Sequence, residues 1–388
     1  MPEHRPHRRA RAGAALLLAA AAVLSACSAP ANVAPPSTAT PTRAPLAEAA
    51  ALQQVLDDSR ARVGFPGVIA RVIRSGAGWD GASGSAAAGG SRLPAPDDRT
   101  RVGSLTKTMT ATIVLQLAQE GLLSLDEPIS RYVPDLPNPE ATISQVLDMT
   151  SGIPSYTLDP DITDAYLARP WQEWTPEQLL DGVRSLPAQF PPGTGWQYSN
   201  SNYVALGVMI EKVTGKPVAD VFQERIFGPL GMTSSSFPMD DTIPAPYLAG
   251  VTAQGAEGGQ TRDATRWSPS FAFTAGQVVS TMDDLERWAH ALFTGEGVLD
   301  PATQRLRHDS ILTWPPPNTA TTGYGYGIGN REGWWGHDGD IPGYTTSLVH
   351  NYQTDTTIIV IVNSDIPDGE TGLAPAPYVL AQLQAALG

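Results

Sequence analysis

The sequence predicts an α/β fold of the α+β type, in which an antiparallel sheet is flanked by helices and joined to a mostly helical subdomain. Strand-like segments lie at both ends of the folded part: GVIARVIR at residues 67–74, and TTSLVHNY and TTIIVIVN near the C-terminus. The last two are separated by QTD, a pattern typical of an antiparallel pair. Helical patterns fill the chain between these ends, so we expect one sheet built from the termini and a helical insert.

The first helices follow from the spacing of apolar residues. Leucine and valine predict a helix in residues 46–62, and a turn region rich in glycine, serine and alanine follows the strand 67–74. A core helix is predicted to begin at Ser104 and to end before Gly121. The apolar residues that define it are Leu105, Met109, Ile113 and Leu117.

The later helices are predicted in the same way. TISQVLDMTSGIP and PWQEWTPEQLLDGV are helical pieces broken by proline, and NYVALGVMIEKVTG is a helix that stops at Gly215. Residues 240–275 are loop-like. TMDDLERWAHAL opens with Thr281 and Asp284 in capping-box spacing, and APYVLAQLQAAL closes the chain as a helix.

Composition restricts the possible partners and the compartment. The chain has 388 residues and a formal charge of −14, which argues against a nucleic-acid partner because phosphate binding needs a basic face. Residues 1–27 combine a positive start, an apolar run shorter than the roughly 20 residues of a membrane span, and the sequence LSAC. LSAC resembles the lipobox of bacterial lipoproteins, so Cys27, the only cysteine, is the predicted lipidation site.

These features divide the chain into three parts. We expect a lipoprotein signal peptide in residues 1–27, with an ordinary cleaved signal peptide as the alternative. Residues 28–45 are rich in proline, alanine and threonine and predict an extended linker. Residues 46–388 form the predicted folded domain, which we expect to be held at the outer face of a bacterial cytoplasmic membrane.

Ser104 and Lys107 are the first candidates for chemistry. At positions i and i+3 of a helix their side chains share one face. A lysine is normally a cation, but burial beside apolar groups lowers its pKa, and a neutral amine can then take the proton of a serine hydroxyl. The backbone N–H of a serine at a helix start is also free to stabilise an oxyanion.

Two further segments carry candidate residues. Tyr198 and Asn200 lie two positions apart before a helix, where they could assist proton transfer and bind a carbonyl, or form a structural turn. His337, Asp338 and Gly339 come just before a strand, where glycine permits another backbone to approach closely. An ordinary turn is the alternative for that segment.

Together these motifs resemble a known family. Ser104-x-x-Lys107, Tyr198-x-Asn200 and His337-Asp338-Gly339 follow one another along the chain. This order is similar to that of the serine β-lactamase/D-alanyl-D-alanine carboxypeptidase family, in the branch of penicillin-binding carboxypeptidases, class C β-lactamases, esterases and D-aminopeptidases. Segments such as MTSGIPSY, FPPGTGWQYSNSNYVALG and GHDGDIPGY also look like family blocks, and the resemblance covers most of residues 46–388. It implies the β-lactamase/transpeptidase fold.

The resemblance also implies a role for each motif residue. Ser104 would be the acylated nucleophile and Lys107 its base, and Tyr198 would share proton transfer and protonate the leaving group. Asn200 would bind the acyl-side carbonyl. The backbone N–H groups of Ser104 and Asp340 would hold the oxyanion, and the mechanism would need no metal and no cofactor.

The segment after His337 bears on the substrate. His337 stands where many relatives carry lysine and others histidine, and Gly339 is in the matching place. Asp338 and Asp340 point to the same side of a strand, where relatives that bind a free carboxylate often have hydroxyl residues. Two carboxylates should repel such an anion, by about 4 kcal/mol for one pair at 4 Å and an effective dielectric of 20. Arg331 is near enough in sequence to be a candidate for compensation.

Two classes of function stay open. The first is a surface-anchored serine hydrolase, D-alanyl-D-alanine carboxypeptidase-like or esterase/amidase-like, with a class C-like β-lactamase as an alternative. The second is a non-catalytic lipoprotein that binds penicillin or peptidoglycan. The expected partner is a small-molecule or peptide substrate: an acyl ester, an amide or a D-alanyl peptide. Trp334 and Trp335 would then line an apolar pocket or serve only in packing.

Overall fold

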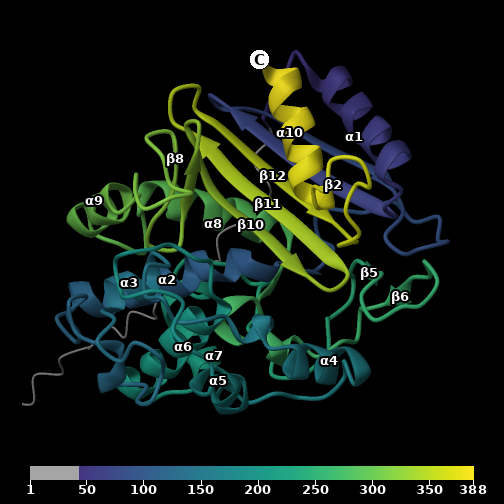
Figure 1. Ribbon diagram of the computed structural model, residues 1–388. Coiled ribbons are helices and arrows are strands. Elements are labelled where there is room, and N and C mark those ends of the chain that lie inside the picture. The colour runs from purple at the N-terminus through teal and green to yellow at the C-terminus, as the bar shows by residue number, and fades with distance from the viewer. Residues whose placement is uncertain (1–42) are drawn as a thin grey trace, which may run out of the picture. The chain divides into compact units, whose positions relative to one another are not determined.

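A sheet of eight strands forms the centre of the computed structural model, which describes residues 43–388 (Figure 1). In spatial order the strands are β1 (Ala44–Pro45), β3 (Ala77–Gly84), β2 (Gly67–Arg74), β12 (Thr356–Val362), β11 (Tyr344–Asn351), β10 (Trp334–Ile341), β9 (Gly329–Arg331) and β8 (Thr322–Tyr324). Neighbours are antiparallel except β1 and β3, which are parallel. The predicted antiparallel sheet is confirmed, and β2 beside β12 joins the two ends of the fold.

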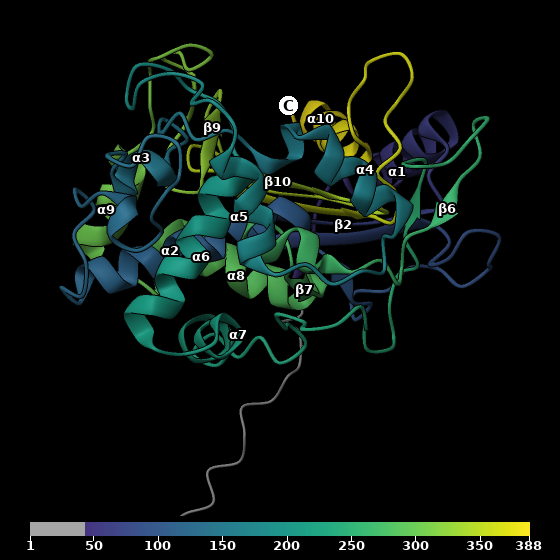
Figure 2. The same ribbon diagram turned by 60° about the horizontal axis from the view of Figure 1, so that its bottom comes forward.

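The two faces of the sheet are covered by different layers. Helices α1 (Ala49–Val63) and α10 (Pro375–Leu387) pack together on one face (Figure 1). The other face packs on the helical subdomain, which comes forward in Figure 2. Its helices are α2 (Thr106–Gln119), α3 (Ile143–Leu147), α4 (Pro160–Ala168), α5 (Pro176–Arg184), α6 (Asn200–Thr214), α7 (Val218–Phe222), α8 (Met282–Thr294) and α9 (Pro301–Asp309).

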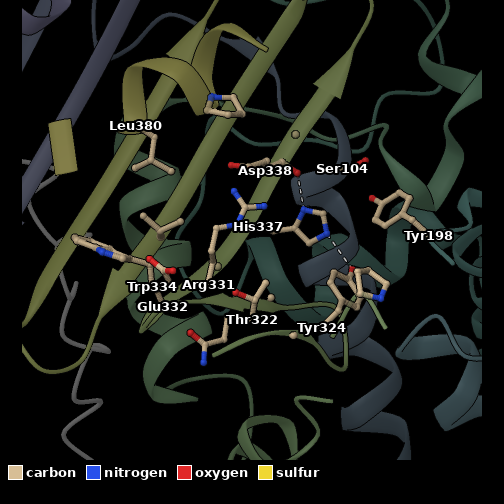
Figure 3. A pocket seen from close by; sticks show the side chains of 18 of the residues that line it. Ser104, Tyr198, Thr322, Tyr324, Arg331, Glu332, Trp334, His337, Asp338 and Leu380 are labelled. Atoms are coloured by element: carbon tan, nitrogen blue, oxygen red, sulfur yellow. Dashed lines mark hydrogen bonds between the residues drawn. The ribbon is translucent and has the colours of Figure 1, made fainter. Parts of the chain in front are cut away.

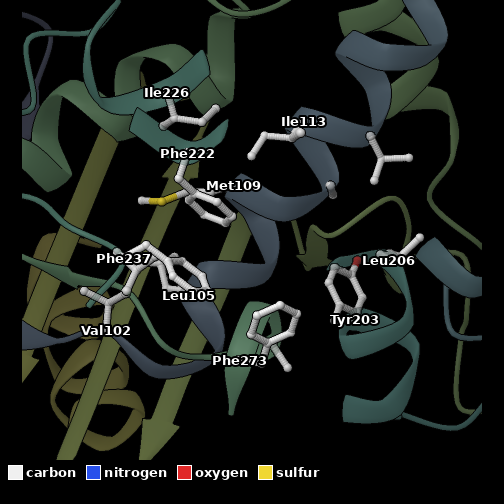
Figure 4. Close-up of a cluster of buried hydrophobic side chains, with 14 of the residues drawn as sticks. Val102, Leu105, Met109, Ile113, Tyr203, Leu206, Phe222, Ile226, Phe237 and Phe273 are labelled. Carbon is white, nitrogen blue, oxygen red and sulfur yellow. The ribbon is translucent and has the colours of Figure 1, made fainter. Parts of the chain in front are cut away.

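Helix α2 runs through the centre of the core. The four predicted core residues are fully buried: Leu105 in the turn before α2, and Met109, Ile113 and Leu117 within it. Figure 4 shows Leu105, Met109 and Ile113 among aromatic and aliphatic side chains of the subdomain. The threonines of α2 are buried as well, because their hydroxyl groups find partners inside the protein. Thr110, for example, donates to the carbonyl of Thr274, and Thr106 accepts from the backbone N–H of Val278. A helix that is buried on all sides can keep the polar groups of an active site away from solvent.

Several predicted helix ends are confirmed. Gly215 closes α6 in the left-handed conformation at φ 67°, and the Thr281 hydroxyl accepts from the N–H of Asp284 at the start of α8. Short elements complete the subdomain. They are β4 (Thr100–Arg101) with β7 (Val279–Ser280), β5 (Val251–Thr252) with β6 (Arg262–Asp263), and single helical turns at Gly103–Leu105, Ile129–Arg131, Tyr156–Leu158, Pro269–Phe271 and Phe273–Ala275, with a π-turn at Gln223–Phe227.

Two expectations about local structure are wrong. The predicted turn region after residue 74 is largely strand β3, where Asp80 pairs with the buried Arg71 of β2. Small residues suit this strand, since a Cβ on Gly81 would lie 2.1 Å from the ring of Trp79. His337 also lies within β10 and not before a strand, because β10 begins at Trp334 and His337 pairs with Leu348 of β11.

The predicted signal peptide, Cys27 and most of the linker lie outside the described residues. Within residues 43–388, no helix combines the length and the hydrophobicity required to span a membrane.

Candidate active site

Ser104 and Lys107 lie in contact at the start of the central helix. Ser104 occupies the single helical turn Gly103–Leu105 that leads into α2, and Lys107 is in the first turn of α2. The Lys107 Nζ lies 2.9 Å from the Ser104 Oγ. The i, i+3 contact expected from the sequence is therefore present in the fold.

The environment of Lys107 favours a neutral amine. Its side chain is fully buried, and this burial holds the pKa of Lys107 well below its ordinary value. Nζ has two further partners, the Asn200 Oδ1 at 2.8 Å and the carbonyl oxygen of Ala275 at 2.7 Å. A neutral amine has two N–H groups for these acceptors and keeps its lone pair for the Ser104 hydroxyl. Lys107 is thus placed to act as a base.

Tyr198 and Asn200 approach the same point from the start of α6. The Tyr198 hydroxyl faces Ser104 (Figure 3), and the Lys107 Nζ lies 4.8 Å from the centre of the Tyr198 ring. Burial raises the pKa of Tyr198 well above its ordinary value, although contact with Ser104 partly offsets this effect. Tyr198 is therefore a phenol at neutral pH. Because Asn200 Oδ1 accepts from Lys107, the amide N–H groups of Asn200 are left for a substrate carbonyl.

His337 is held as a neutral imidazole. Its Nδ1 faces the carbonyl oxygen of Asp338, which can only accept, so Nδ1 carries the proton. Nε2 then accepts from the Tyr324 hydroxyl at 2.9 Å (Figure 3). Burial lowers the pKa of His337 to about 4. Position 337 thus carries no positive charge at neutral pH.

Two glycines let the turn Gly103–Leu105 lie against β10. A Cβ on Gly339 would be 1.9 Å from the carbonyl oxygen of Val102, and one on Gly103 would be 2.7 Å from the backbone nitrogen of Asp340. The backbone that approaches Gly339 is that of Val102 in this chain. The contact brings the N–H of Asp340 beside Ser104.

The free edge of β10 orients that N–H group. Strand β9 pairs only with Trp334–Gly336, so in the described part of the chain the rest of β10 is an edge. β10 and β11 join through a two-residue turn, Pro342–Gly343, and alternation along an antiparallel ladder directs the Asp340 N–H away from β11. The N–H groups of Ser104 and Asp340 thus form a possible oxyanion site.

Asp338 and Asp340 lie on the sheet face opposite His337. Asp338 accepts a hydrogen bond of 2.6 Å from Ser347, and burial raises its pKa. Burial and the neighbouring Asp365 carboxyl raise the pKa of Asp340 to about 7. Both carboxyl groups line the cavity at Ser104, together with Arg331 and Glu332. The rim of the cavity, as we call these four residues, therefore carries three carboxyl groups and one guanidinium.

Two cavities meet at Ser104. The larger, of about 870 Å³, contains Tyr198 and His337, while the smaller, of about 240 Å³, contains Asn200. Asp340 lines both. Aromatic rings form the wall of the smaller cavity, where Tyr166 stacks on Phe271 with ring centres 4.0 Å apart.

Some residues of the site were not predicted from the sequence. Tyr324 was not singled out, although glycine alternates with aromatic residues in GYGYG just before β9, a pattern that could have marked a close-packed strand. The two tryptophans also differ in role: Trp334 lines the larger cavity, while Trp335 stacks on His308 at 3.8 Å. Among residues 43–388, no group of three or more histidine, cysteine and acidic side chains could hold a metal ion.

Comparisons with known proteins agree with this geometry. A family model described as Beta-lactamase matches residues 52–382. A D-stereospecific amidohydrolase from Streptomyces sp. is 30% identical, with a TM-score of 0.76 over 86% of this chain and 97% of that one. The D-amino acid amidase from Ochrobactrum anthropi SV3, complexed with L-phenylalanine amide, is 31% identical, with a TM-score of 0.75 over 87% of this chain and 97% of that one.

A curated relative is more distant. Protein flp of Staphylococcus aureus (strain MRSA252) is 26% identical over 279 residues, which make up 69% of this chain and 53% of that protein. The chain thus spans about half the length of this relative.

Proposed function

Because the chain belongs to the beta-lactamase family, we propose that it is a serine hydrolase that cleaves amides or esters of amine-bearing acyl groups through an acyl-enzyme on Ser104. The observation that carries this proposal is the 2.9 Å contact between the Ser104 hydroxyl and the buried amine of Lys107. A lysine buried without a charged partner costs stability, and activation of a nucleophile is a reason to bear that cost.

The proposed reaction has two halves, the acylation of Ser104 and the hydrolysis of the acyl-enzyme. The Lys107 amine takes the Ser104 proton while Oγ bonds to the substrate carbonyl carbon, and the electron pair moves onto the carbonyl oxygen. The N–H groups of Ser104 and Asp340 stabilise that oxyanion. When the carbon–nitrogen bond breaks, the leaving nitrogen takes the Tyr198 proton, and the Lys107 ammonium returns a proton to the phenolate. Water then hydrolyses the ester and regenerates Ser104.

The smaller cavity supports an amino-acyl group as the part that is transferred. Its volume of about 240 Å³ and its aromatic wall suit a bulky apolar side chain, and Asn200 lies where it could bind the acyl carbonyl. Asp340 at the same cavity would attract an ammonium group. The similarity to structures named as a D-amino acid amidase and a D-stereospecific amidohydrolase supports a D-aminoacyl substrate for this chain.

The charge around Ser104 disfavours substrates with a free carboxylate. Three carboxyl groups and one guanidinium line the larger cavity, and His337 is neutral. D-alanyl-D-alanine peptides and most β-lactams would bring an anion to this rim. We therefore propose amidase or esterase activity in preference to D-alanyl-D-alanine carboxypeptidase or class C-like β-lactamase activity.

We also propose that the enzyme works at the outer face of the cytoplasmic membrane, anchored through a lipid on Cys27. The support is the lipobox-like LSAC and the linker-like composition that follows it. Cys27→Ala should move the protein from the membrane fraction to the soluble fraction. Retention of that variant in the membrane would argue against the anchor.

The function is tested with the full-length protein and the p-nitroanilides of D- and L-phenylalanine, beside a fluorescent penicillin. We expect turnover of the D isomer, an acyl adduct on Ser104 by intact mass, and a loss of at least about 1000-fold in Ser104→Ala. Ser91→Ala, an exposed serine, is the control. A stable penicillin adduct without anilide turnover would instead favour a penicillin-binding protein.

A further inference from the structure

The larger cavity does not end at the catalytic groups. Along β10, residues alternate between the two faces of the sheet, so that His337 and Gly339 face the subdomain while Trp334 and Asp338 face α10. The cavity is lined from both faces, which means that it passes around the free edge of β10. Figure 3 shows Ser104 and Tyr198 at one end and Trp334 and Leu380 at the other.

The far end of this cavity is apolar. Its wall on the α10 side is made of Trp334, Val349, Ala374, Pro377 and Leu380. We call this wall the α10 groove. Val349 and Leu380 also belong to the core between the sheet and α10, which fixes the groove in place. Gln384 of α10 adds a polar side chain to the lining of the cavity.

The positions of two groups show which part of a substrate would enter each cavity. Tyr198, the proton donor to the leaving group in the proposed reaction, lines the larger cavity but not the smaller. Asn200, placed for the acyl carbonyl, lines the smaller cavity but not the larger. The leaving group therefore departs into the larger cavity and towards the α10 groove.

The size of that cavity is informative. A primary amide releases ammonia, which would use almost none of the 870 Å³ beside Tyr198. Cavities of several hundred cubic ångströms ordinarily enclose molecules of many atoms, and apolar walls bind apolar chains. The carboxyl groups of Asp338 and Asp340 lie where the path crosses the edge, so the part of the leaving group that passes them carries no negative charge.

We infer that the α10 groove is a leaving-group subsite for an apolar chain, so that the preferred substrates are N-alkyl or N-arylalkyl amides, or the matching esters, and not primary amides. This inference rests on the proposed function of Ser104. In the cleavage, the carbon–nitrogen bond breaks, the nitrogen takes the Tyr198 proton, and the amine with its apolar chain leaves from the groove.

The test keeps the acyl part constant and lengthens the leaving group. The full-length protein is assayed with D-phenylalanine amide and its N-butyl, N-hexyl and N-octyl derivatives. We expect kcat/KM to rise about two- to fourfold per methylene until the groove is filled. Leu380→Ala should reduce the ratio of octylamide to primary-amide kcat/KM at least tenfold. Leu373→Ala, an exposed leucine just before α10, should keep the wild-type ratio.

A second measurement needs no variant. Free butylamine, hexylamine and octylamine should inhibit the wild-type protein with an inhibition constant that falls as the chain lengthens. If the primary amide is hydrolysed in a Ser104-dependent way but chain length changes neither kcat/KM nor inhibition, the groove is not a leaving-group subsite. If no amide is hydrolysed at all, the proposed function itself is wrong, and the subsite is overturned with it.

Discussion

The Tyr324 hydroxyl and the His337 Nε2 lie 2.9 Å apart, and this contact joins β8 to the strand that borders the nucleophile. Together with the carbonyl oxygen of Asp338 at Nδ1, it leaves His337 with one donated and one accepted hydrogen bond. Both contacts suit the neutral ring. The Tyr324 hydroxyl therefore helps to stabilise the uncharged form of His337.

Replacing Tyr324 with phenylalanine removes the donor to Nε2. Because this hydrogen bond stabilises the neutral ring, we expect the pKa of His337 to rise, by less than about one unit for a bond worth about 1 kcal/mol. In the variant, kcat/KM for a carboxylate-bearing substrate should increase towards acid pH, since protonated His337 attracts the anion. Tyr326→Phe is the control, and identical pH profiles for Tyr324→Phe and wild type would contradict the assignment.

Lys107 should make folding stability depend on pH. The unfolded chain holds a lysine proton up to a pKa of about 10.4, while burial holds the folded-state pKa of Lys107 well below that value. Between the two pKa values the unfolded state binds one more proton, so stability rises with pH by up to about 1.4 kcal/mol per unit. Urea unfolding at pH 7, 8 and 9 should show this slope in the wild type and its absence in Lys107→Met. Parallel curves would mean that folded Lys107 is charged.

Gly339 controls how closely the turn Gly103–Leu105 approaches β10. In Gly339→Ala, the added Cβ would lie 1.9 Å from the Val102 carbonyl oxygen, so the turn or the strand must move. We expect a loss of about 1–3 kcal/mol in unfolding free energy and about 100-fold in kcat/KM, because the oxyanion N–H groups separate. Gly369→Ala has open space around its Cβ and should change neither quantity. A fully active Gly339→Ala enzyme would refute the close contact.

Asp338 and Asp340 are expected to select substrates by charge. Changing both to asparagine should raise kcat/KM for a carboxylate-bearing D-alanyl peptide and lower it for an amine-bearing amide, each about three- to tenfold, because partly exposed charges interact by about 1 kcal/mol. Both effects should shrink in high salt. Asp58→Asn removes a similar charge from α1, far along the chain, and tests for an effect of net charge alone. Equal changes for the two substrates would rule out charge selection.

Local patterns predicted much of the fold because the forces involved are local. β2 was predicted with its bounds, since its eight residues begin with a glycine, are rich in valine and isoleucine, and are followed by a turn. The end of α6 at Gly215 was also predicted, because a residue that closes a helix in the left-handed backbone conformation is usually a glycine. β3 was missed because its stability comes from a partner strand and from the Arg71–Asp80 ion pair, neither of which has a local signature.

The same division applies to the site. The spacing of Ser104 and Lys107 and the order of the three motifs were enough to name the candidate residues and to indicate the family. Tertiary structure decided what those residues can do. Burial favours the neutral forms of Lys107 and His337, and the free edge of β10 opens the path to the α10 groove. Residue identity and spacing are properties of the chain, whereas pKa values and cavities depend on groups that meet only when distant segments pack together.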